Sequence, residues 1–425
     1  MKKTMTIISH ISRIIIGLLF VFSGYVKAVD PLGFTYKLGE YFESMHLEFL
    51  APFALALAIL VIAAELAMGL CLLARVRMQL VAWGVLLFML FFTFLTFYIA
   101  VKGNVVKDCG CFGDALILSN TATFLKNLFL MPFVVIIFLW RKKYTPVAKC
   151  LVDWAIAIAC FAFAVCIQLY CLNYLPVIDF MPYKVGTNIP KAMELPENAK
   201  PDQYKTTYVY SKNGEVKEFD DTNFPWNDPT WTYVSIHTEL VEKGDEPKIH
   251  DFDIYNTDGE NVTEDIIRSE NFTFLFTLRN VENINLSYMN KVNDIASYCL
   301  ITDGFDFYAY TAANSDEIEE FIAKTNAIYP FYSGDGTTIK TMIRSNPGLV
   351  LIKDGNILAK WSYKNIPSIE KIIRLTETDY ETIVANAKAS ERNTTLLFAL
   401  IALMLICFMP VMKFVKVKFL KKVKQ

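Results

Sequence analysis

The chain has 425 residues, 41 Lys and Arg against 43 Asp and Glu, and 54% apolar residues. This apolar share, with a mean hydropathy of +0.34, indicates a membrane protein with a soluble part and excludes a disordered chain. No basic face with interleaved aromatic residues can be found, which argues against a nucleic-acid-binding protein.

Six apolar stretches are each near the roughly 20 residues needed to cross a bilayer. They cover residues 7–26, 51–73, 81–101, 124–140, 154–175 and 394–414. Six spans place both termini on one side of the membrane. The short loops and the tail on that side are rich in Lys and Arg, at residues 2–3, 75–77, 141–149 and 413–424. The positive-inside rule predicts that this side is cytoplasmic, in a multi-pass protein of the bacterial inner membrane.

The charge is divided unevenly between the two sides. Residues 177–392 carry 21 Lys and Arg against 35 Asp and Glu, a net charge of −14, whereas the rest of the chain has a net charge of +12. We therefore expect an acidic periplasmic domain that stands off anionic membrane lipid. The loop before the fourth span faces the same side, where thiols can be oxidised.

That loop contains two cysteines one residue apart. Cys109 and Cys111 flank a glycine within the run Asp108–Asp114. A glycine-centred bend can bring the two thiols within disulfide range, and the small ring would make the bond strained and easily reduced. The alternative is a loop that merely contains two cysteines, because reactivity requires an exposed environment. The pair is the candidate redox site, and no metal is predicted because no further Cys or His lies close in sequence.

Glu65 is an ionisable residue inside the second span. It precedes Arg75 by ten residues, which places it about 15 Å from the cytoplasmic end of the helix, near the middle of the bilayer. A carboxyl group at this depth should face the bundle. Arg13 is the basic residue expected to approach it, since Lys27 lies toward the outer end of the first span. A packing hydrogen bond with a Ser or Tyr hydroxyl, and a role in proton-coupled or quinone-coupled chemistry, both remain open.

No definite cofactor is predicted, because no quinone motif can be identified. The remaining membrane cysteines are interpreted as small apolar residues, namely Cys71, Cys150, Cys160, Cys166 and Cys407. Cys171 is different because it lies at the outer end of the fifth span, one turn before Pro176. It is a candidate resolving thiol for the pair at Cys109 and Cys111.

The first four spans resemble the DoxX/MauE family of small four-helix membrane proteins, over about residues 9–140. The resemblance depends on the C-G-C-F-G run and on Ser23, Gly24, Lys27, Asp30, Pro31, Gly33, Glu65 and Gly69. It implies an inner-membrane protein linked to envelope redox chemistry, with the MauE branch associated with disulfide formation or maturation of a periplasmic partner. The fifth span and the appended domain depart from the short members, so a methylamine-utilisation role is not transferred.

The outer segment begins with a proline-rich stretch, predicted to be an extended linker. Residues 206–210 and 216–219 are predicted to form a hairpin, and further strands are expected at 231–237 and 251–255. From residue 272 strands and helices alternate, which predicts a central sheet flanked by helices. The expected strands are 272–278, 306–310, 348–353 and 357–363. The expected helices are 286–298, 316–327 and one that starts near residue 367. A further segment of the alternating pattern covers residues 337–344.

This order, with the run Ser345–Gly348 before a strand and its hairpin, resembles a thioredoxin-like domain of the thiol-disulfide interchange type. The resemblance implies a cis peptide bond before Pro347, facing the active site. Glu282 and Asn285 stand where the family has its two cysteines. Without a thiolate at a helix N-terminus, the domain is expected to keep the fold and not the reaction. Cys299 is the one thiol of the outer domain and is expected to be buried.

The predicted fold is thus a six-span α-helical bundle with an α/β thioredoxin-like periplasmic domain. Its parts are a four-helix membrane domain at 1–145, a fifth span at 146–176, a linker and β-rich lead-in at 177–250, the thioredoxin-like domain at 251–392, and a sixth span with a basic tail at 393–425.

Two functions remain open. In the first, Cys109 and Cys111 exchange disulfides with a separate periplasmic client or redox protein. In the second, the protein is a non-enzymatic membrane subunit that docks an envelope client through its acidic domain, with the cysteine pair as a structural staple. The oligomeric state is not predicted.

Overall fold

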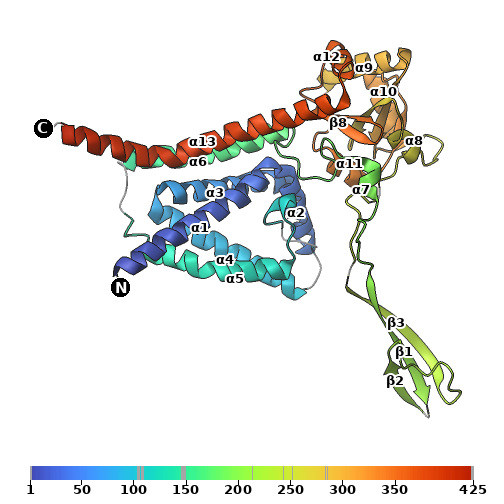
Figure 1. Ribbon diagram of the computed structural model, residues 1–425, viewed down its shortest axis with the longest axis horizontal. Coiled ribbons are helices and arrows are strands. Elements are labelled where there is room, and N and C mark those ends of the chain that lie inside the picture. The colour runs from blue at the N-terminus through green and yellow to red at the C-terminus, as the bar shows by residue number, and fades with distance from the viewer. Residues whose placement is uncertain are drawn as a thin grey trace.

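The computed structural model describes residues 2–102, 106, 110–144, 150–212, 214–242, 244–250, 252–282, 284 and 286–422. Within these ranges, six helices are long and apolar enough to cross a membrane, as predicted. They are α1 (Lys2–Val29), α3 (Ala54–Ala74), α4 (Met78–Lys102), α5 (Asn120–Trp140), α6 (Cys150–Asn173) and α13 (Tyr380–Lys422). The start of α1 and the end of α13 lie at one end of the bundle (Figure 1), here called the termini side. The opposite end, which carries the soluble domain, is called the domain side.

Helices α1 and α3 pack closely because two glycines lie at their crossing. A Cβ atom on Gly24 would come within 2.8 Å of the Leu66 backbone, and one on Gly69 within 2.7 Å of the Val21 nitrogen. Small residues let membrane helices approach until their backbones touch. This close approach allows short polar side chains of α1 and α3 to reach each other inside the bundle.

A short amphipathic helix, α2 (Pro31–Ser44), follows α1 on the domain side and was not predicted from the sequence. Asp30 caps it, since its side chain accepts a hydrogen bond from the Gly33 nitrogen at 3.0 Å, and Pro31 occupies the first helical position. Both features are typical of a helix N-terminus. A 3-10 turn, η1 (Glu48–Phe53), then leads into α3.

The soluble domain contains a five-stranded mixed sheet in the order β6-β5-β4-β7-β8. Its strands are β4 (Phe272–Leu278), β5 (Phe305–Thr311), β6 (Phe331–Ser333), β7 (Gly348–Lys353) and β8 (Asn356–Ser362). Strand β4 is parallel to β5 and antiparallel to β7. The helices are α7 (Ile189–Met193), α8 (Thr263–Ile267), α9 (Met289–Ile301), α10 (Ser315–Thr325), α11 (Gly336–Met342) and α12 (Ile369–Thr376), with the 3-10 turn η3 (Leu286–Tyr288) before α9. The predicted fold class, a six-span bundle with an α/β domain of thioredoxin-like element order, is confirmed.

Several predicted boundaries were wrong. The expected linker already belongs to the soluble domain, because Tyr183 and Ile189 are buried in its core and the Ile189 nitrogen donates to the Gly355 carbonyl. The expected strand at 251–255 is reduced to isolated bridges at Tyr255, with Asp251 outside the described residues. Strand β6 was missed because it has three residues.

The soluble domain and the sixth span are joined by one continuous helix. Helix α13 has 43 residues and runs from the sheet along α6 (Figure 1). The expected domain boundary between residues 392 and 393 therefore falls inside a helix. Because no flexible linker separates the two parts here, α13 constrains how the domain sits on the bundle.

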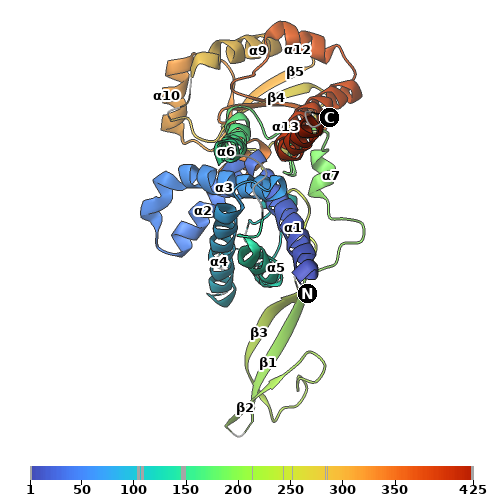
Figure 2. The same cartoon turned by 90° about the vertical axis from the view of Figure 1, so that its left-hand side faces the viewer.

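Three strands form a separate arm that projects away from both domains (Figures 1 and 2). They are β1 (Gln203–Lys212), β2 (Glu215–Phe219) and β3 (Thr232–Glu242), in the order β2-β1-β3. The predicted hairpin is the antiparallel pair of β1 and β2. Val234, Leu240 and Trp226 of this arm are exposed.

Candidate functional site

The cysteine loop lies on the domain side, against α1 and α2. Cys109 lies outside the described residues, and Cys111 is half-buried. Gly110 and Gly113 have φ of +62° and +52°, so two residues that tolerate the left-handed region shape the turn around Cys111. The loop continues into the 3-10 turn η2 (Gly113–Ala115).

A polar cluster beneath the loop consists of Ser23 and Lys27 from α1 and Glu65 from α3. The Ser23 hydroxyl oxygen lies 2.7 Å from the Glu65 Oε1 atom and 2.7 Å from the Cys111 carbonyl oxygen. Because a hydroxyl carries a single hydrogen, Ser23 donates to one of these acceptors at a time. The serine thus connects the cysteine loop to a carboxyl group inside the bundle.

Glu65 forms an ion pair with Lys27, and the expectation that it would pair with Arg13 was wrong. The Lys27 Nζ atom lies 2.5 Å from Glu65 Oε2, and both side chains are buried, at 4% and 6% exposure. Arg13 instead donates to the carbonyl oxygens of Leu72 and Leu73, at the other end of α3. Lys27 and Arg13 are about 21 Å apart along α1, so only one of them can reach the level of Glu65. The expected burial of Glu65 in the bundle is confirmed. The hydrogen bond to a serine hydroxyl, one of the two alternatives left open, is present.

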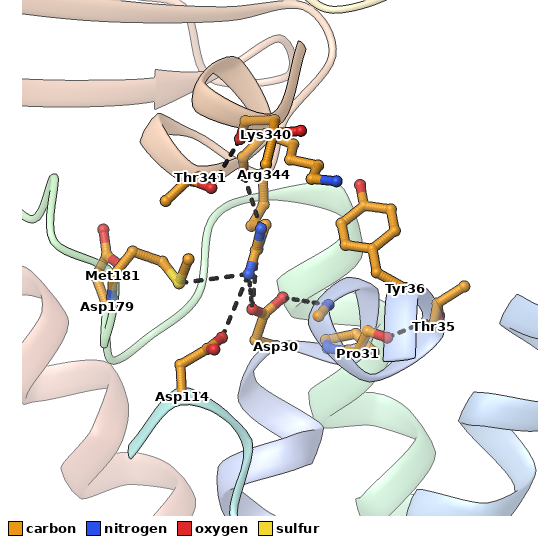
Figure 3. Close-up of polar contacts among 12 residues, drawn as sticks. Asp30, Pro31, Thr35, Tyr36, Asp114, Asp179, Met181, Lys340, Thr341 and Arg344 are labelled. Atoms are coloured by element: carbon orange, nitrogen blue, oxygen red, sulfur yellow. Dashed lines mark hydrogen bonds and ion pairs between the residues drawn. The ribbon is translucent and has the colours of Figure 1, made fainter. Parts of the chain in front are cut away.

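The soluble domain is anchored above this cluster by Arg344, which follows α11. Figure 3 shows its guanidinium group directed at the carboxylate of Asp30, with Asp114 beside it. The Arg344 Nη2 atom lies 2.7 Å from Asp30 Oδ2 and 3.4 Å from Asp114 Oδ2, and Nε donates to the same Asp30 oxygen at 2.9 Å. Only 8% of the Arg344 side chain is exposed. Asp114 ends the cysteine run, so this contact connects the soluble domain to the loop.

Tyr36 of α2 provides a second contact between the domains. Its hydroxyl oxygen accepts a hydrogen bond from Arg279, and its ring lies 5.2 Å from Lys340 Nζ and 5.7 Å from the Arg344 guanidinium carbon. These are cation–π distances. Sequence patterns did not identify Tyr36, Asp114 or Arg344 as contacts between the two domains. The only available signal was the position of Asp114 at the end of the cysteine run.

The edge of the soluble domain that faces the bundle contains Pro347 and the loop after β4. The Asn346–Pro347 peptide is cis, as expected. Asn346 Oδ1 accepts from the Arg279 nitrogen at 2.9 Å, and Asn346 Nδ2 donates to the Asn280 carbonyl at 2.8 Å. The loop after β4 is therefore held beside Pro347. Glu282 in that loop is exposed, and Asn285 lies outside the described residues.

A cavity of about 200 Å³ lies between the two domains. It is lined on the membrane side by Lys27, Asp30 and Gly110, and on the other side by Met181 and Arg344. Its walls carry both signs of charge. Within the described part of the chain, no group of three or more His, Cys, Asp or Glu side chains could hold a metal ion.

The two remaining candidate thiols are both buried. Cys171 lies at the domain-side end of α6 and is buried. Its role as a resolving thiol stays a prediction. Cys299 lies in the core of the soluble domain, as expected, and burial raises the pKa of its thiol to about 12. Little thiolate therefore exists there at neutral pH.

We expect the full chain with Cys109→Ser and Cys111→Ser to show no insulin reduction above the dithiothreitol background. The remaining thiols are buried or within membrane helices, and Cys299 is held as a neutral thiol. The turbidity assay for insulin reduction checks this, with the further variant Cys299→Ser as a control. Turnover above background that disappears on adding Cys299→Ser would show that the soluble domain keeps an active thiol.

Comparison with family models gives matches to the first four spans and to the arm. The family model of methylamine utilisation protein MauE matches residues 5–141. A model described as a domain of unknown function, DUF8463, matches residues 204–243, which correspond to the arm. No curated protein is similar enough to the chain to be counted as a relative.

Solved structures similar to the soluble domain are thiol-disulfide proteins and an assembly factor. A candidate protein disulfide isomerase from Bacteroides thetaiotaomicron is 20% identical, with a TM-score of 0.25 over 30% of this chain and 82% of that one. A C-terminal domain of a candidate thiol-disulfide oxidoreductase from the same organism is 17% identical, with a TM-score of 0.25 over 32% and 93%. BsSco, of the Sco family of cytochrome c oxidase assembly proteins, is 14% identical, with a TM-score of 0.24 over 34% and 93%. These identities are too low to transfer an activity.

The part of the chain that contains the Ser23, Lys27 and Glu65 cluster lies inside the matched residues 5–141. The match covers the four helices α1, α3, α4 and α5, and ends before α6. The N-terminal membrane domain of this chain therefore matches the MauE family model, and two further spans and an α/β domain follow it in the sequence.

Proposed function

We propose that this protein exchanges disulfides with a periplasmic client during its maturation, through Cys109 and Cys111. The observation that carries the proposal is the link from the Cys111 carbonyl through Ser23 to the buried pair of Glu65 and Lys27. A purely structural disulfide would not require a buried ion pair beneath it, because desolvating two charges is costly. The cluster instead holds the loop in one position relative to the bundle.

In the proposed reaction, a client thiolate attacks the Cys109–Cys111 disulfide and forms a mixed disulfide. The second client thiol then displaces the membrane cysteine, so the client leaves oxidised and the pair is left as two thiols. The soluble domain is assigned a non-catalytic role as a cover that positions the client. Arg344 and Arg279 place its cysteine-free edge over the loop, and the cavity between the domains lies next to Gly110.

Trapping a mixed disulfide tests this proposal. With Cys111→Ser, the thiol of Cys109 is left without its neighbour and is expected to remain bound to a client through a bond that dithiothreitol cleaves. Non-reducing electrophoresis and mass spectrometry of the purified adduct identify the client. The matched control is Cys166→Ser, which removes a thiol on α6 outside the loop. Absence of any reducible adduct with either Cys109→Ser or Cys111→Ser contradicts the proposal.

The arm favours a second function, in which the protein is a docking subunit of an envelope complex. Strands β1–β3 project from the soluble domain (Figure 2). Apolar side chains of this arm are exposed. In this case the cysteine pair would form a structural disulfide, and the double variant Cys109→Ser, Cys111→Ser would still support client maturation. Retained maturation in that variant, together with its loss when residues 203–242 are deleted, would favour docking over exchange.

The proposed periplasmic location leads to a labelling prediction. A membrane-impermeant maleimide applied to reduced, intact spheroplasts should label Cys109 or Cys111, because the Lys and Arg bias predicts that the domain side faces outward. Labelling is measured by the mass of the loop peptide, and a variant without both cysteines is the control. Labelling that requires permeabilised membranes would reverse the topology and remove the oxidising environment on which the exchange depends.

A further inference from the structure

A cavity of about 150 Å³ lies at the termini side of the bundle. Arg75 and Arg77 line it from the turn between α3 and α4. Tyr144 lines it from the segment after α5, and Asp153 lines it from the first turn of α6. A cavity of about this volume can hold a molecule of the size of benzene. It therefore has room for a small polar group, between two cationic side chains and one carboxyl group.

Tryptophan and exposed leucine side chains place the cavity at the level of the lipid headgroups. Trp83 near the start of α4, Trp140 at the end of α5 and Trp154 near the start of α6 all lie toward the termini side. Tryptophan is enriched at the two membrane–water interfaces, where its ring sits among the headgroups. Leu80, which lines the cavity, and Leu151 are 55% and 82% exposed, as expected for side chains that contact lipid. A lipid headgroup is therefore the molecule that lies closest to this cavity.

Two buried polar atoms of the cavity wall have no partner within the part of the chain that the structure describes. Asp153 is only 5% exposed, and its Oδ1 atom accepts no hydrogen bond there. The Arg77 Nε atom is also buried and donates none. Buried polar groups are normally hydrogen-bonded, and buried charges are normally paired. The site thus suits a ligand that brings a cationic donor to Asp153 and an acceptor to Arg77.

The walls of the cavity are held in position by other contacts. The Arg77 guanidinium carbon lies 4.3 Å from the centroid of the Trp154 ring, and its Nη1 atom lies 3.4 Å from the Cys150 sulfur. The Tyr144 hydroxyl donates to the Ser9 carbonyl oxygen of α1 at 2.9 Å. Because a hydroxyl carries a single hydrogen, Tyr144 shapes the cavity without donating into it. A site whose side chains are already fixed loses less conformational entropy when a ligand binds.

We propose that this cavity binds the phosphoethanolamine headgroup of phosphatidylethanolamine. The phosphate accepts a hydrogen bond from Arg77 and is attracted by the charge of Arg75, while the ammonium group donates to Asp153. Guanidinium groups suit this role because their N–H donors match the geometry of phosphate oxygens. A choline headgroup has no N–H donor and leaves the Asp153 oxygen unsatisfied. Phosphatidylglycerol and free phosphate bring no cation to that oxygen.

The bound lipid would join two parts of the chain that the family match separates. Residues 5–141 match the MauE model, whereas Asp153 belongs to α6, which follows them. On the protein side, α6 is joined to α3 by Gln168, which donates to the Ile59 carbonyl at 3.2 Å. A headgroup held by both Arg77 and Asp153 adds a second link at the termini side. The site lies at the opposite end of the bundle from the cysteine loop, so this inference does not depend on the proposed exchange.

Lipid binding is measured on the purified full chain, freed of lipid in detergent, by native mass spectrometry. The probes are dioleoyl-phosphatidylethanolamine, dioleoyl-phosphatidylcholine and dioleoyl-phosphatidylglycerol. We expect one tightly bound phosphatidylethanolamine per chain, with an affinity about tenfold or more above that of the other two lipids, because neither brings a charged donor to Asp153. Glycerophosphoethanolamine, which has the same headgroup without acyl chains, should not displace the bound lipid at equal concentration.

Two variants test the two ends of the headgroup separately. Asp153→Asn should remove the preference for phosphatidylethanolamine while leaving the affinity for phosphatidylglycerol unchanged. Arg77→Gln should weaken the binding of all three lipids by about tenfold, because each of them contains the phosphate. The matched control is Arg141→Gln, on the same side of the bundle, which should change none of the affinities. Arg141 donates to the Phe138 carbonyl and is not among the described residues that line the cavity. Thermal unfolding without added lipid shows that each variant is folded.

Equal affinities of the wild type for the three lipids would overturn the proposal. A preference for phosphatidylethanolamine that survives Asp153→Asn would overturn it as well, because the carboxyl group would then not read the ammonium group. If glycerophosphoethanolamine bound as tightly as the lipid, the ligand would be a soluble compound and the lipid assignment would be wrong. None of these results affects the trapping of a mixed disulfide at the cysteine loop, so the two proposals can fail separately.

Discussion

Replacing Glu65 with leucine is expected to lower the free energy of unfolding in detergent by about 3 to 5 kcal/mol, the cost of leaving one partner of a buried ion pair uncompensated. Lys27 is 3% exposed and is held 2.5 Å from the Glu65 carboxylate. Leucine also removes the acceptor of the Ser23 hydroxyl. Thermal or denaturant unfolding of the purified chain measures the effect.

Two matched variants separate the charge from the hydrogen bond. Glu65→Gln keeps an acceptor for Ser23 while removing the charge, so it should be milder than Glu65→Leu. Combining Glu65→Leu with Lys27→Met removes both charges and should recover much of the loss, because replacing a buried pair with apolar side chains is often nearly neutral. Equal stability of the wild type and Glu65→Leu would remove the cluster from the list of important sites.

Replacing Arg344 with glutamine is expected to release the soluble domain from the cysteine loop and to speed alkylation of Cys111 by about tenfold or more. The guanidinium group is buried and contacts both Asp30 and Asp114. Loss of one partner of such a pair costs about 3 to 5 kcal/mol. Each 1.4 kcal/mol by which the closed arrangement of the two domains is destabilised raises the fraction of open molecules about tenfold. The alkylation rate with a small maleimide, measured by mass spectrometry, checks this.

Arg279→Gln is the control for Arg344→Gln. It removes a guanidinium group from the same face of the soluble domain but leaves the contact to Asp30 and Asp114 in place. Its effect on the alkylation rate should be smaller, since it contacts the bundle through Tyr36. Equal rates in wild type, Arg344→Gln and Arg279→Gln would show that the soluble domain does not cover the loop through this contact.

The sequence was informative where the signal lies in neighbouring residues. Six apolar stretches predicted six spans because crossing hydrocarbon requires a continuous apolar helix of fixed length. The hairpin of β1 and β2 and the strands β4, β5, β7 and β8 followed from local alternation and turn residues, whereas β6 was too short to be recognised. Glu65 was predicted to face the bundle because lipid excludes a carboxyl group at that depth. In the same way, the absence of cysteine after β4 can be read directly along the chain.

Only the tertiary structure decided which distant residues meet. The choice of Lys27 over Arg13 as the partner of Glu65 depends on the close crossing of α1 and α3 at Gly24 and Gly69, which brings only one level of α1 to the carboxyl group. The contact of Arg344 with Asp30 depends on where the soluble domain sits on the bundle. Hydropathy determines that a helix lies in the membrane, but its rotation, height and neighbours result from side-chain packing summed over all the helices. For this reason the spans and the α/β domain could be predicted from the sequence, whereas the ion pairs beside the cysteine loop could not.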